Sequence, residues 1–544
     1  MSNDLEYGRE CYERREWPGA LEALRAADQA RPLDCEDVER LGIAAYLVGH
    51  EIEFELCFDR LHRAQLEQGH RENAARTAFW LGMSLMFRGE IARSNAWIAR
   101  GQRLVDNRDC VEQGYLLIPG TERSLRDGHA ATAQADAAMA AQIGERFGDS
   151  DLVAVARHVE ARALIDQHQI AAGLERLDEM MLPVVAGELS PMTTGLMYCS
   201  VLDACRKVCA LSRAREWTTA FARWCERQSE PLAFSSTCLV HRAEVLRLHG
   251  AWSEALEDAS RACDCAARGS RKPPAAALYQ QGEVHRLRGD HAAAEEAYRA
   301  ASQFGYDPQP GLALLRAAEG RVDAACGAMR RMLHSTTDRS HRARLLPSCV
   351  EVLLAAGERD EARGAWRELQ AISEALDADA LRAAAAQAEG AIELAEGRPD
   401  VALGPLQRAF AWWTDLDVPY DAARVRVMIA LACHAVHDEE TTRLELAAAR
   451  TVFERLCARH DLARVDRLTR TMTPAERPKL SPREREVIHL IAAGATNKAI
   501  AAQLSVSERT VDRHVSNILL KLNLPTRSAA TAYAYQHDLV GRTG

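Results

Sequence analysis

The sequence has 544 residues, of which 47% are hydrophobic and 27% are charged. This composition is typical of a folded, water-soluble protein and excludes collagen-like and disordered chains. The length exceeds the roughly 100–200 residues of one domain, so we expect several domains or one long repeat array. The N-terminus has no basic segment followed by an apolar run, and no stretch approaches the ~18 apolar residues of a spanning helix. We therefore expect a cytoplasmic protein with no membrane partner.

The fifteen cysteines are scattered and include no Cys-x-x-Cys pair. We interpret them as reduced, mostly buried thiols. Two clusters could be mistaken for metal sites: one joins Cys433, His434 and His437, and the other contains several cysteines between Cys199 and Cys238, followed by His241. Neither has a complete ligand set at a familiar spacing, so we predict structural roles and no metal.

Charge is distributed unevenly along the chain. Residues 479–544 contain nine Lys or Arg and five Asp or Glu, a net charge of +4, whereas residues 1–478 contain 59 basic and 73 acidic residues, a net charge of −14. An acidic body repels a polyanion and a basic tail attracts one, so this pattern favours nucleic-acid contact at the C-terminal end alone. Residues 470–478 contain two prolines without apolar periodicity and are predicted to be a linker.

Residues 236–469 repeat one layout: a helix with a small residue, a break at Gly, and a second helix with Ala and a bulky residue. In the clearest copy, Gly282 precedes a break at Gly289, and Ala294, Tyr298 and Ala301 follow. The small residues let two helices approach closely, and the bulky residue fills the space beside them. This layout resembles tetratricopeptide repeats, in which a 34-residue unit forms two antiparallel helices.

The match to that repeat is partial. The second-helix alanines Ala255, Ala294, Ala362 and Ala402 lie 39, 68 and 40 residues apart. Residues 1–235 keep helical periodicity but lose the signature, and we predict degenerate helical repeats there. The fold class predicted for residues 1–469 is an all-α, tetratricopeptide-like α-solenoid. Its concave surface is a candidate site for a ligand or a protein partner, and the alternative is a spacer or an oligomerisation surface.

Three helices with clear start signals are predicted between residues 481 and 523. Ser481 and Glu484 form a capping box with Pro482 at the first helical position. A short second helix begins at Thr496 or Asn497. The third helix, Ser507–Asn523, has one apolar face (Val511, Val515, Ile518, Leu519 and Leu522) and one polar face (Arg509, Asp512, Arg513, Ser516 and Lys521). Two short helices joined by a tight turn, with an exposed basic face on the second, predict a helix-turn-helix.

Four segments of this region carry a resemblance to a known family. They are Leu-Ser-Pro-Arg-Glu-Arg-Glu-Val, Ala-Gly-Ala-Thr-Asn-Lys-Ala-Ile-Ala, Leu-Ser-Val-Ser-Glu-Arg-Thr-Val and His-Val-Ser-Asn-Ile-Leu-Leu-Lys-Leu. Residues 479–544 closely resemble the LuxR-type DNA-binding domain. The resemblance implies a four-helix domain that forms a homodimer through its last helix, here residues 528–540, and binds paired half-sites in double-stranded DNA.

The resemblance also implies roles for individual residues. Base-reading contacts fall on Asp512, Arg513 and Ser516. Phosphate contacts fall on Thr496, Asn497, Lys498, Arg509, Thr510 and Lys521. Asp512 departs from the family, since many relatives have Lys there. A carboxylate is repelled by phosphate but can accept a hydrogen bond from the cytosine amino group, and Arg513 can donate two bonds to guanine.

No other chemistry is indicated. There is no Gly-x-x-x-x-Gly-Lys motif, and only Lys207 and Lys272 precede the linker, which excludes a Walker-type ATP site. We find no receiver domain and no nucleophile with a paired base, so we predict no enzyme and no cofactor.

The sequence predicts a sequence-specific DNA-binding transcription regulator whose array senses a small-molecule or protein effector, with RNA polymerase as a candidate partner. The alternative is an interaction scaffold that its C-terminal domain tethers to DNA or dimerises.

Overall fold

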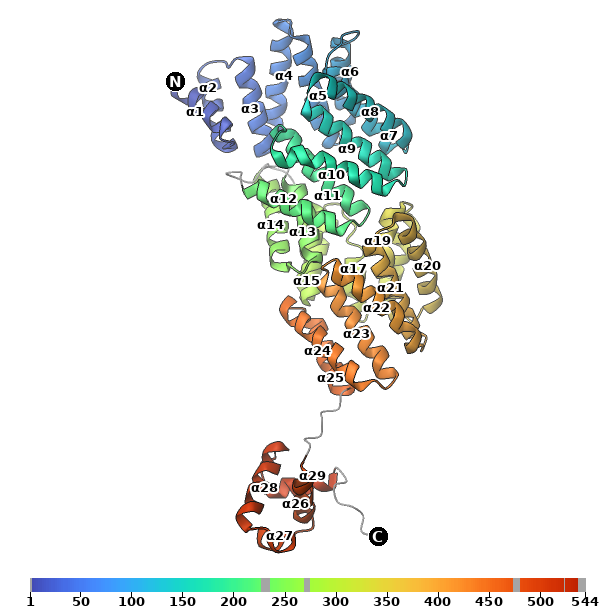
Figure 1. Ribbon diagram of the computed structural model, residues 1–544. Coiled ribbons are helices and arrows are strands. Elements are labelled where there is room, and N and C mark those ends of the chain that lie inside the picture. Colours follow the sequence, from blue (N-terminus) through green and yellow to red (C-terminus); the bar gives the residue numbers. More distant parts are fainter. Residues whose placement is uncertain (1, 227–234, 269–273, 473–479, 523, 537–544) are drawn as a thin grey trace. The chain divides into compact units, whose positions relative to one another are not determined.

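The computed structural model describes residues 2–226, 235–268, 274–472, 480–522 and 524–536. These residues form twenty-nine helices and no strand, which confirms the predicted all-α class (Figure 1). Contacts divide the chain into two compact units, Met1–Val465 and Asp466–Gly544. Across the described residues, no helix is both long enough and apolar enough to cross a membrane.

The helices of the first unit are all between 8 and 18 residues long. They are α1 (Ser2–Glu13), α2 (Trp17–Ala30), α3 (Cys35–Val48), α4 (Glu51–Glu67), α5 (Arg71–Phe87), α6 (Ile91–Leu104), α7 (Glu112–Arg126), α8 (Ala130–Phe147), α9 (Ser150–Asp166), α10 (Ile170–Ala186), α11 (Pro191–Lys207), α12 (Leu211–Glu226), α13 (Ser235–Leu248), α14 (Trp252–Arg268), α15 (Ala275–Arg288), α16 (His291–Gln303), α17 (Gly311–Ala318), α18 (Val322–Ser335), α19 (Arg339–Ala355), α20 (Arg359–Leu376), α21 (Asp379–Ala395), α22 (Pro399–Asp415), α23 (Pro419–Ala435), α24 (Glu439–Leu456) and α25 (Arg459–Met472).

Small residues set the spacing inside the hairpins, as the repeat pattern predicts. In the α15–α16 hairpin, a Cβ on Gly282 would lie only 2.6 Å from the ring of Tyr298, so glycine is needed at this crossing. Ala294 and Tyr298 are fully buried. Gly390 of α21 faces Leu406 of α22 at a similar distance. The predicted helical solenoid is confirmed, and in several hairpins a glycine lies opposite a large side chain.

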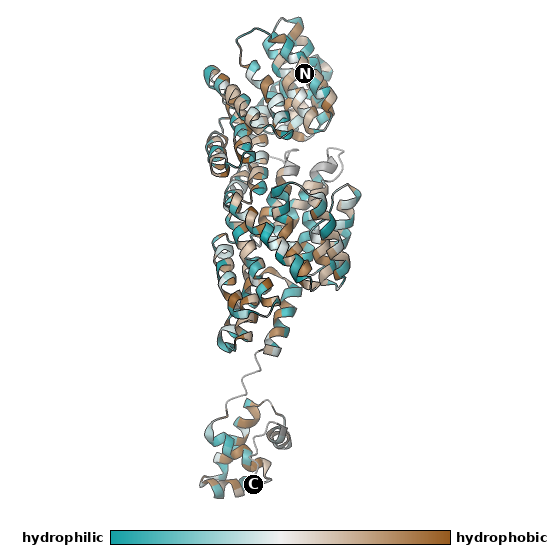
Figure 2. Cartoon of the chain, turned by 90° about the vertical axis from the view of Figure 1, so that its right-hand side faces the viewer, coloured by the Kyte–Doolittle hydropathy of each residue, from teal (hydrophilic) through white to brown (hydrophobic). Residues whose placement is uncertain are grey.

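The apolar faces of these helices merge into continuous cores. Polar and apolar residues are interspersed along the helices (Figure 2). One core runs from Cys11 to Val245 and therefore crosses residue 235, where the sequence suggests a change from degenerate to regular repeats. Trp217, Trp224 and Trp252 are buried, as expected for core residues. Hydrophobic burial of this kind, at about 25 cal/mol per Å² of apolar surface, is the main stabilising contribution to the array.

The array also makes contacts between segments far apart in the sequence. Arg215 of α12 forms an ion pair with Asp417 at 2.8 Å, and the His249 Nδ1–H group donates to the Asp417 carbonyl at 2.7 Å. The ring of Trp252 lies 5.6 Å from the ring of Tyr420 on α23. The later helices therefore fold back onto α12–α14.

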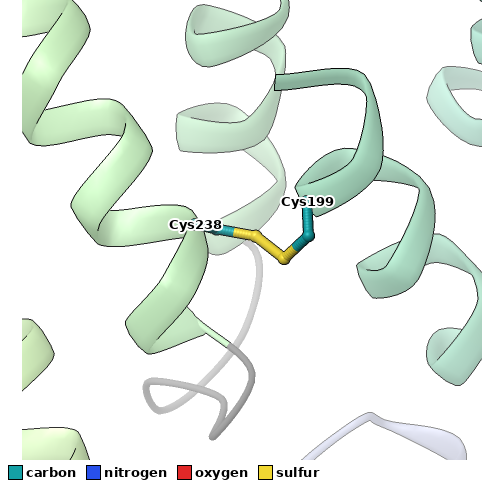
Figure 3. The surroundings of a disulfide bond; sticks show 2 residues. All are labelled: Cys199 and Cys238. Atoms are coloured by element: carbon teal, nitrogen blue, oxygen red, sulfur yellow. A yellow bond between two sulfur atoms is a disulfide. The ribbon is translucent and has the colours of Figure 1, made fainter. Parts of the chain in front are cut away.

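One prediction about the cysteines is wrong. Cys199 of α11 and Cys238 of α13 form a disulfide (Figure 3). The two helices pack side by side and bring the Cα atoms to 5.1 Å, within the usual bridging range. The residues are 39 positions apart, so local spacing carries no sign of the pairing. Seven other cysteines, Cys57 and Cys205 among them, are buried thiols.

The helix α25 extends to Met472, so residues 470–472 of the predicted linker are helical. The remaining linker residues, 473–478, lie outside the described residues.

Candidate nucleic-acid interface

Beyond α25, the described residues of the second unit form four helices: α26 (Pro482–Ala492), α27 (Asn497–Leu504), α28 (Glu508–Lys521) and α29 (Arg527–Gln536). Ser481 forms the predicted capping box with Glu484. Thr496 caps α27, and its hydroxyl accepts from the Ala499 amide; Ser507 caps α28 in the same way through Thr510. These caps satisfy amide groups that the helices leave without a partner. The three predicted helix starts are confirmed.

A small apolar core fixes the angle between these helices. Val487 and Ile488 of α26, Ile500 of α27, and Val511 and Ile518 of α28 are fully buried. Between α27 and α28, Ser505 adopts a left-handed backbone conformation with φ of 53°, and α28 begins three residues later. The geometry is that of a helix-turn-helix, with α28 in the place of a recognition helix. The predicted end of α28 at Asn523 lies outside the described residues.

The outward face of α28 carries the residues predicted to read bases. Asp512, Arg513 and Ser516 are all exposed. Among the predicted phosphate contacts, Thr496, Lys498, Arg509 and Lys521 are exposed, and Asn497 and Thr510 are partly buried. Within the described part of the chain, Lys498, Arg509 and Arg513 have no ion-pair partner. Most arginines of the array, by contrast, are paired with carboxylates; Arg215 with Asp417 is one such pair. Free exposed cations on one face suit contact with phosphates and base edges.

Asp512 is held in place by its neighbours. The Asn497 side-chain amide donates to Asp512 Oδ1 at 2.5 Å, and Arg527 donates to Asn497 Oδ1 at 2.5 Å. Arg527 also donates to the Ala495 carbonyl at 2.5 Å. The predicted phosphate contact Asn497 and the predicted base reader Asp512 thus form one hydrogen-bonded unit. One Asp512 oxygen stays available to accept a further hydrogen bond.

Lys521 is engaged by a buried carboxylate. Its Nζ atom lies 2.7 Å from Glu484 Oε2, and Glu484 also accepts from the Ser481 amide at 2.7 Å. Burial opposes ionisation of Glu484, but the bonds from Lys521 and Ser481 outweigh it and hold the Glu484 pKa below its ordinary value. Lys521 therefore joins the end of α28 to the start of α26. Its phosphate contact stays a prediction.

Two positioning residues were missed in the sequence. Arg527 orients Asn497, as described above. Arg483 donates to the Leu504 carbonyl at the end of α27 and pairs with Glu486 at 2.6 Å. Both contacts join different helices, 21 and 30 residues apart, so helical spacing does not reveal them. The thirteen-residue helix predicted at 528–540 begins at Arg527, and its residues 537–540 lie outside the described residues.

The last helix has one buried and one open side. Ala530 and Ala534 pack fully buried against the domain. Tyr535 is 60% exposed, although its hydroxyl donates to the Ala492 carbonyl at 3.3 Å.

Among the residues that the structure describes, no group of three His, Cys, Asp or Glu side chains could hold a metal ion.

Comparison with known proteins agrees with this geometry. Residues 478–534 match the family model of bacterial regulatory proteins of the luxR family. This region is 46% identical over 61 residues to the response regulator protein VraR of Staphylococcus aureus, and equally to that of Staphylococcus epidermidis. The match covers 11% of this chain and 29% of each relative. Residues 478–534 therefore form a LuxR-family helix-turn-helix domain, and the chain spans less than a third of the length of these relatives.

Solved structures with similar helical arrays cover most of the chain at low identity. A Rap protein complexed with competence and sporulation factor is 14% identical, has a TM-score of 0.46, and is matched over 63% of this chain and 99% of its own. The Cut9–Hcn1 hetero-tetramer of the APC/C is 11% identical, with a TM-score of 0.36, over 84% of this chain and 95% of the other.

Proposed function

We propose that this protein binds specific double-stranded DNA sites as a homodimer and that its helical array controls this binding in response to an effector. The observation that carries the DNA part is the exposed face of α28, where Arg513 and Arg509 have no ion-pair partner in the described residues. A guanidinium free of carboxylates can form two hydrogen bonds with guanine, a pairing that discriminates by about 1–3 kcal/mol.

Asp512, Arg513 and Ser516 are the proposed base readers. The bond from Asn497 orients the Asp512 carboxylate, which can then accept from a cytosine amino group. Arg513 and Asp512 together favour a G·C pair beside a C·G pair.

The phosphate contacts proposed are Thr496, Asn497, Lys498, Arg509, Thr510 and Lys521. Thr496 and Lys498 lie at the N-terminus of α27, where the helix dipole and free amide groups attract a phosphate. Lys498 and Arg509 add positive charges that have no partner among the described residues. These contacts position the domain without reading the sequence. Their removal should therefore weaken binding to all DNA sequences by the same factor.

We assign the homodimer interface to residues 528–540. The exposed Tyr535 and the small residues beside it leave one side of α29 open for a second copy. A twofold dimer presents two recognition helices and predicts paired half-sites in the operator.

The array is the proposed sensor. Its 400-plus residues greatly exceed what a small DNA-binding domain needs for folding, and residues 1–478 have a net charge of −14, which disfavours direct DNA contact. An effector can shift the DNA-competent population only by as much as it prefers that state. Effector and operator must therefore strengthen each other's binding by the same factor.

The experiment is to select genomic DNA fragments with the full-length protein and to measure its affinity for an enriched fragment and for a scrambled one. We expect a clear preference for the enriched fragment and a palindromic half-site pattern. Equal affinity for both would contradict the proposal and would favour an interaction scaffold that its C-terminal domain only tethers to DNA.

A further inference from the structure

A cluster of ionisable side chains lies where α11, α13 and α19 meet the segment that precedes α17. His241 is within electrostatic range of Asp203, Glu244, Arg206 and Arg344. Tyr306 is within range of Glu244, Arg206 and Arg344. These residues are separated by up to about 140 positions in the sequence and meet only because the array curves.

Two oppositely charged side chains in this cluster form no ion pair in the described residues, although Glu244 is within electrostatic range of Arg206. Arg206 pairs with Asp203 at 2.7 Å. Glu244 and Arg344, in contrast, make no ion pair or hydrogen bond in the described residues, and both are partly buried. Arg344 Nε and His241 Nδ1 are buried without a hydrogen-bond partner. A buried polar atom without a hydrogen-bond partner is costly, so Arg344 Nε and His241 Nδ1 favour a ligand that supplies the missing partner.

The surrounding groups favour a ligand with both charges. The formal charges of Arg206 and Arg344 balance those of Asp203 and Glu244. Burial lowers the pKa of His241, so its ring is neutral at neutral pH. A simple anion would be attracted by Arg344 and repelled by Glu244. A simple cation would be attracted by Glu244 and repelled by Arg344. A molecule that carries a carboxylate and an ammonium group satisfies both.

The pocket beside α8, α9 and α10 offers a contrast. It has a volume of about 450 Å³ and is lined by Glu145, Arg157, Arg176 and Glu179. There, Arg157 pairs with Glu145 and Arg176 pairs with Glu179, each at 2.7 Å. The charged side chains of this pocket are already paired with each other. The pocket therefore has fewer unpaired groups with which a ligand could bond.

We propose that Glu244 and Arg344 bind a small zwitterion, either a free α-amino acid or the charged ends of a short peptide. The guanidinium of Arg344 receives the carboxylate through paired hydrogen bonds, and Glu244 accepts from the ammonium group. The His241 ring and the Tyr306 hydroxyl stand beside both charges. This inference rests on the proposed function, since it names the class of effector that the array senses.

The test is calorimetric titration of the full-length protein with each of the twenty L-amino acids in turn and with tetra-alanine. At least one probe should bind. Its N-acetyl and its amide derivatives should each bind roughly tenfold or more weakly, because each lacks one charge that the site pairs. Binding by amino acids and not by tetra-alanine identifies a free amino acid as the ligand, and the reverse identifies a peptide. No binding by any probe at millimolar concentration would overturn the inference.

Two variants separate the roles of the pair. Arg344→Gln should abolish the preference for a free carboxylate over an amide and keep the preference for a free amine. Glu244→Gln should show the opposite pattern. The control is Arg330→Gln, since Arg330 is exposed and pairs with Glu361 at 2.8 Å on the neighbouring helix; it should bind like the parent. If both site variants keep their circular dichroism spectra and lose both preferences equally, the assignment is wrong. Should either variant fail to fold, Arg344→Met or Glu244→Met, which also removes the charge, makes the same comparison.

The same samples distinguish this inference from the proposed function. Affinity for an enriched and for a scrambled DNA fragment, measured without any amino acid, reports on the DNA-binding domain alone. Sequence preference without zwitterion binding contradicts only the ligand assignment. Loss of sequence preference contradicts the proposed function itself.

Discussion

The side-chain amide of Asn497 donates a 2.5 Å hydrogen bond to Asp512, and this bond joins the first helix of the helix-turn-helix to the exposed face of the second. Arg527 of α29 holds the other end of the Asn497 side chain. The one acidic residue on the proposed base-reading face is therefore fixed by a chain of contacts through three helices. A carboxylate fixed in this way can read a base edge instead of only repelling phosphates.

Asp512→Asn tests this role. The change removes a negative charge that faces DNA, so affinity for random DNA should rise. It also removes a strong acceptor for the cytosine amino group, so discrimination at that base pair should fall by about 1–3 kcal/mol. Fluorescence anisotropy with the enriched operator and its single-base variants measures both effects. Unchanged discrimination at every base pair would show that Asp512 does not read sequence.

The contact between Lys521 and Glu484 predicts a pH-dependent stability. Because the folded-state pKa of Glu484 is below its ordinary value of 4.5, its ion pair stabilises the fold above that pH and loses this effect as pH falls through the folded-state pKa. Lys521→Met should lower the free energy of unfolding by about 1 kcal/mol at pH 7. The effect is modest because Lys521 is 41% exposed. The cost should become smaller as pH falls below 4.5 in denaturant unfolding of the 479–544 fragment. A cost that is equal at pH 7 and below pH 4.5 would contradict the pairing.

Two glycines on helices of the array offer a matched comparison. Gly282→Ala places a Cβ 2.6 Å from the Tyr298 ring and should destabilise the array by about 1–3 kcal/mol. Gly364→Ala on α20 meets nothing within 4 Å and should stabilise it by up to about 1 kcal/mol, because alanine favours a helix over glycine. Denaturant unfolding monitored by circular dichroism compares the two. Similar effects of both changes would refute the close crossing of α15 and α16.

Salt dependence locates the DNA contacts. The logarithm of DNA affinity falls linearly with the logarithm of salt concentration, and the slope reports how many phosphates the protein contacts. Because residues 1–478 have a net charge of −14, the full-length protein and the 479–544 fragment should have equal slopes per DNA-binding domain. A much steeper slope for the full-length protein would place phosphate contacts on the array.

Local patterns in the sequence predicted much of this structure. Ser481 with Glu484, Thr496 with Ala499, and Ser507 with Thr510 are each three residues apart, so their capping bonds follow from helix geometry. The repeat alanines and glycines were predicted for the same reason, since one turn of a helix determines which residues share a face.

Contacts between distant segments could not be predicted in this way. Lys521 meets Glu484 across 37 residues, Cys199 meets Cys238 across 39, and Arg215 meets Asp417 across 202. Each depends on how whole helices pack, and a single sequence carries no spacing rule for that. The placement of Glu244 and Arg344 near His241 also depends on how distant helices pack.

The ratio of affinities for the enriched operator and a scrambled fragment, measured for the parent protein and for Arg513→Ala, tests the central claim most directly. Arg513 is exposed on α28 without an ion-pair partner in the described residues, and we assign it to a base. We predict that Arg513→Ala weakens the free energy of binding to the operator by about 1–3 kcal/mol. Its effect on binding to the scrambled fragment should be much smaller. Lys498→Ala is the control for a phosphate contact, and it should weaken binding to the operator and to the scrambled fragment equally. An equal loss on both DNAs for Arg513→Ala would contradict sequence reading by α28.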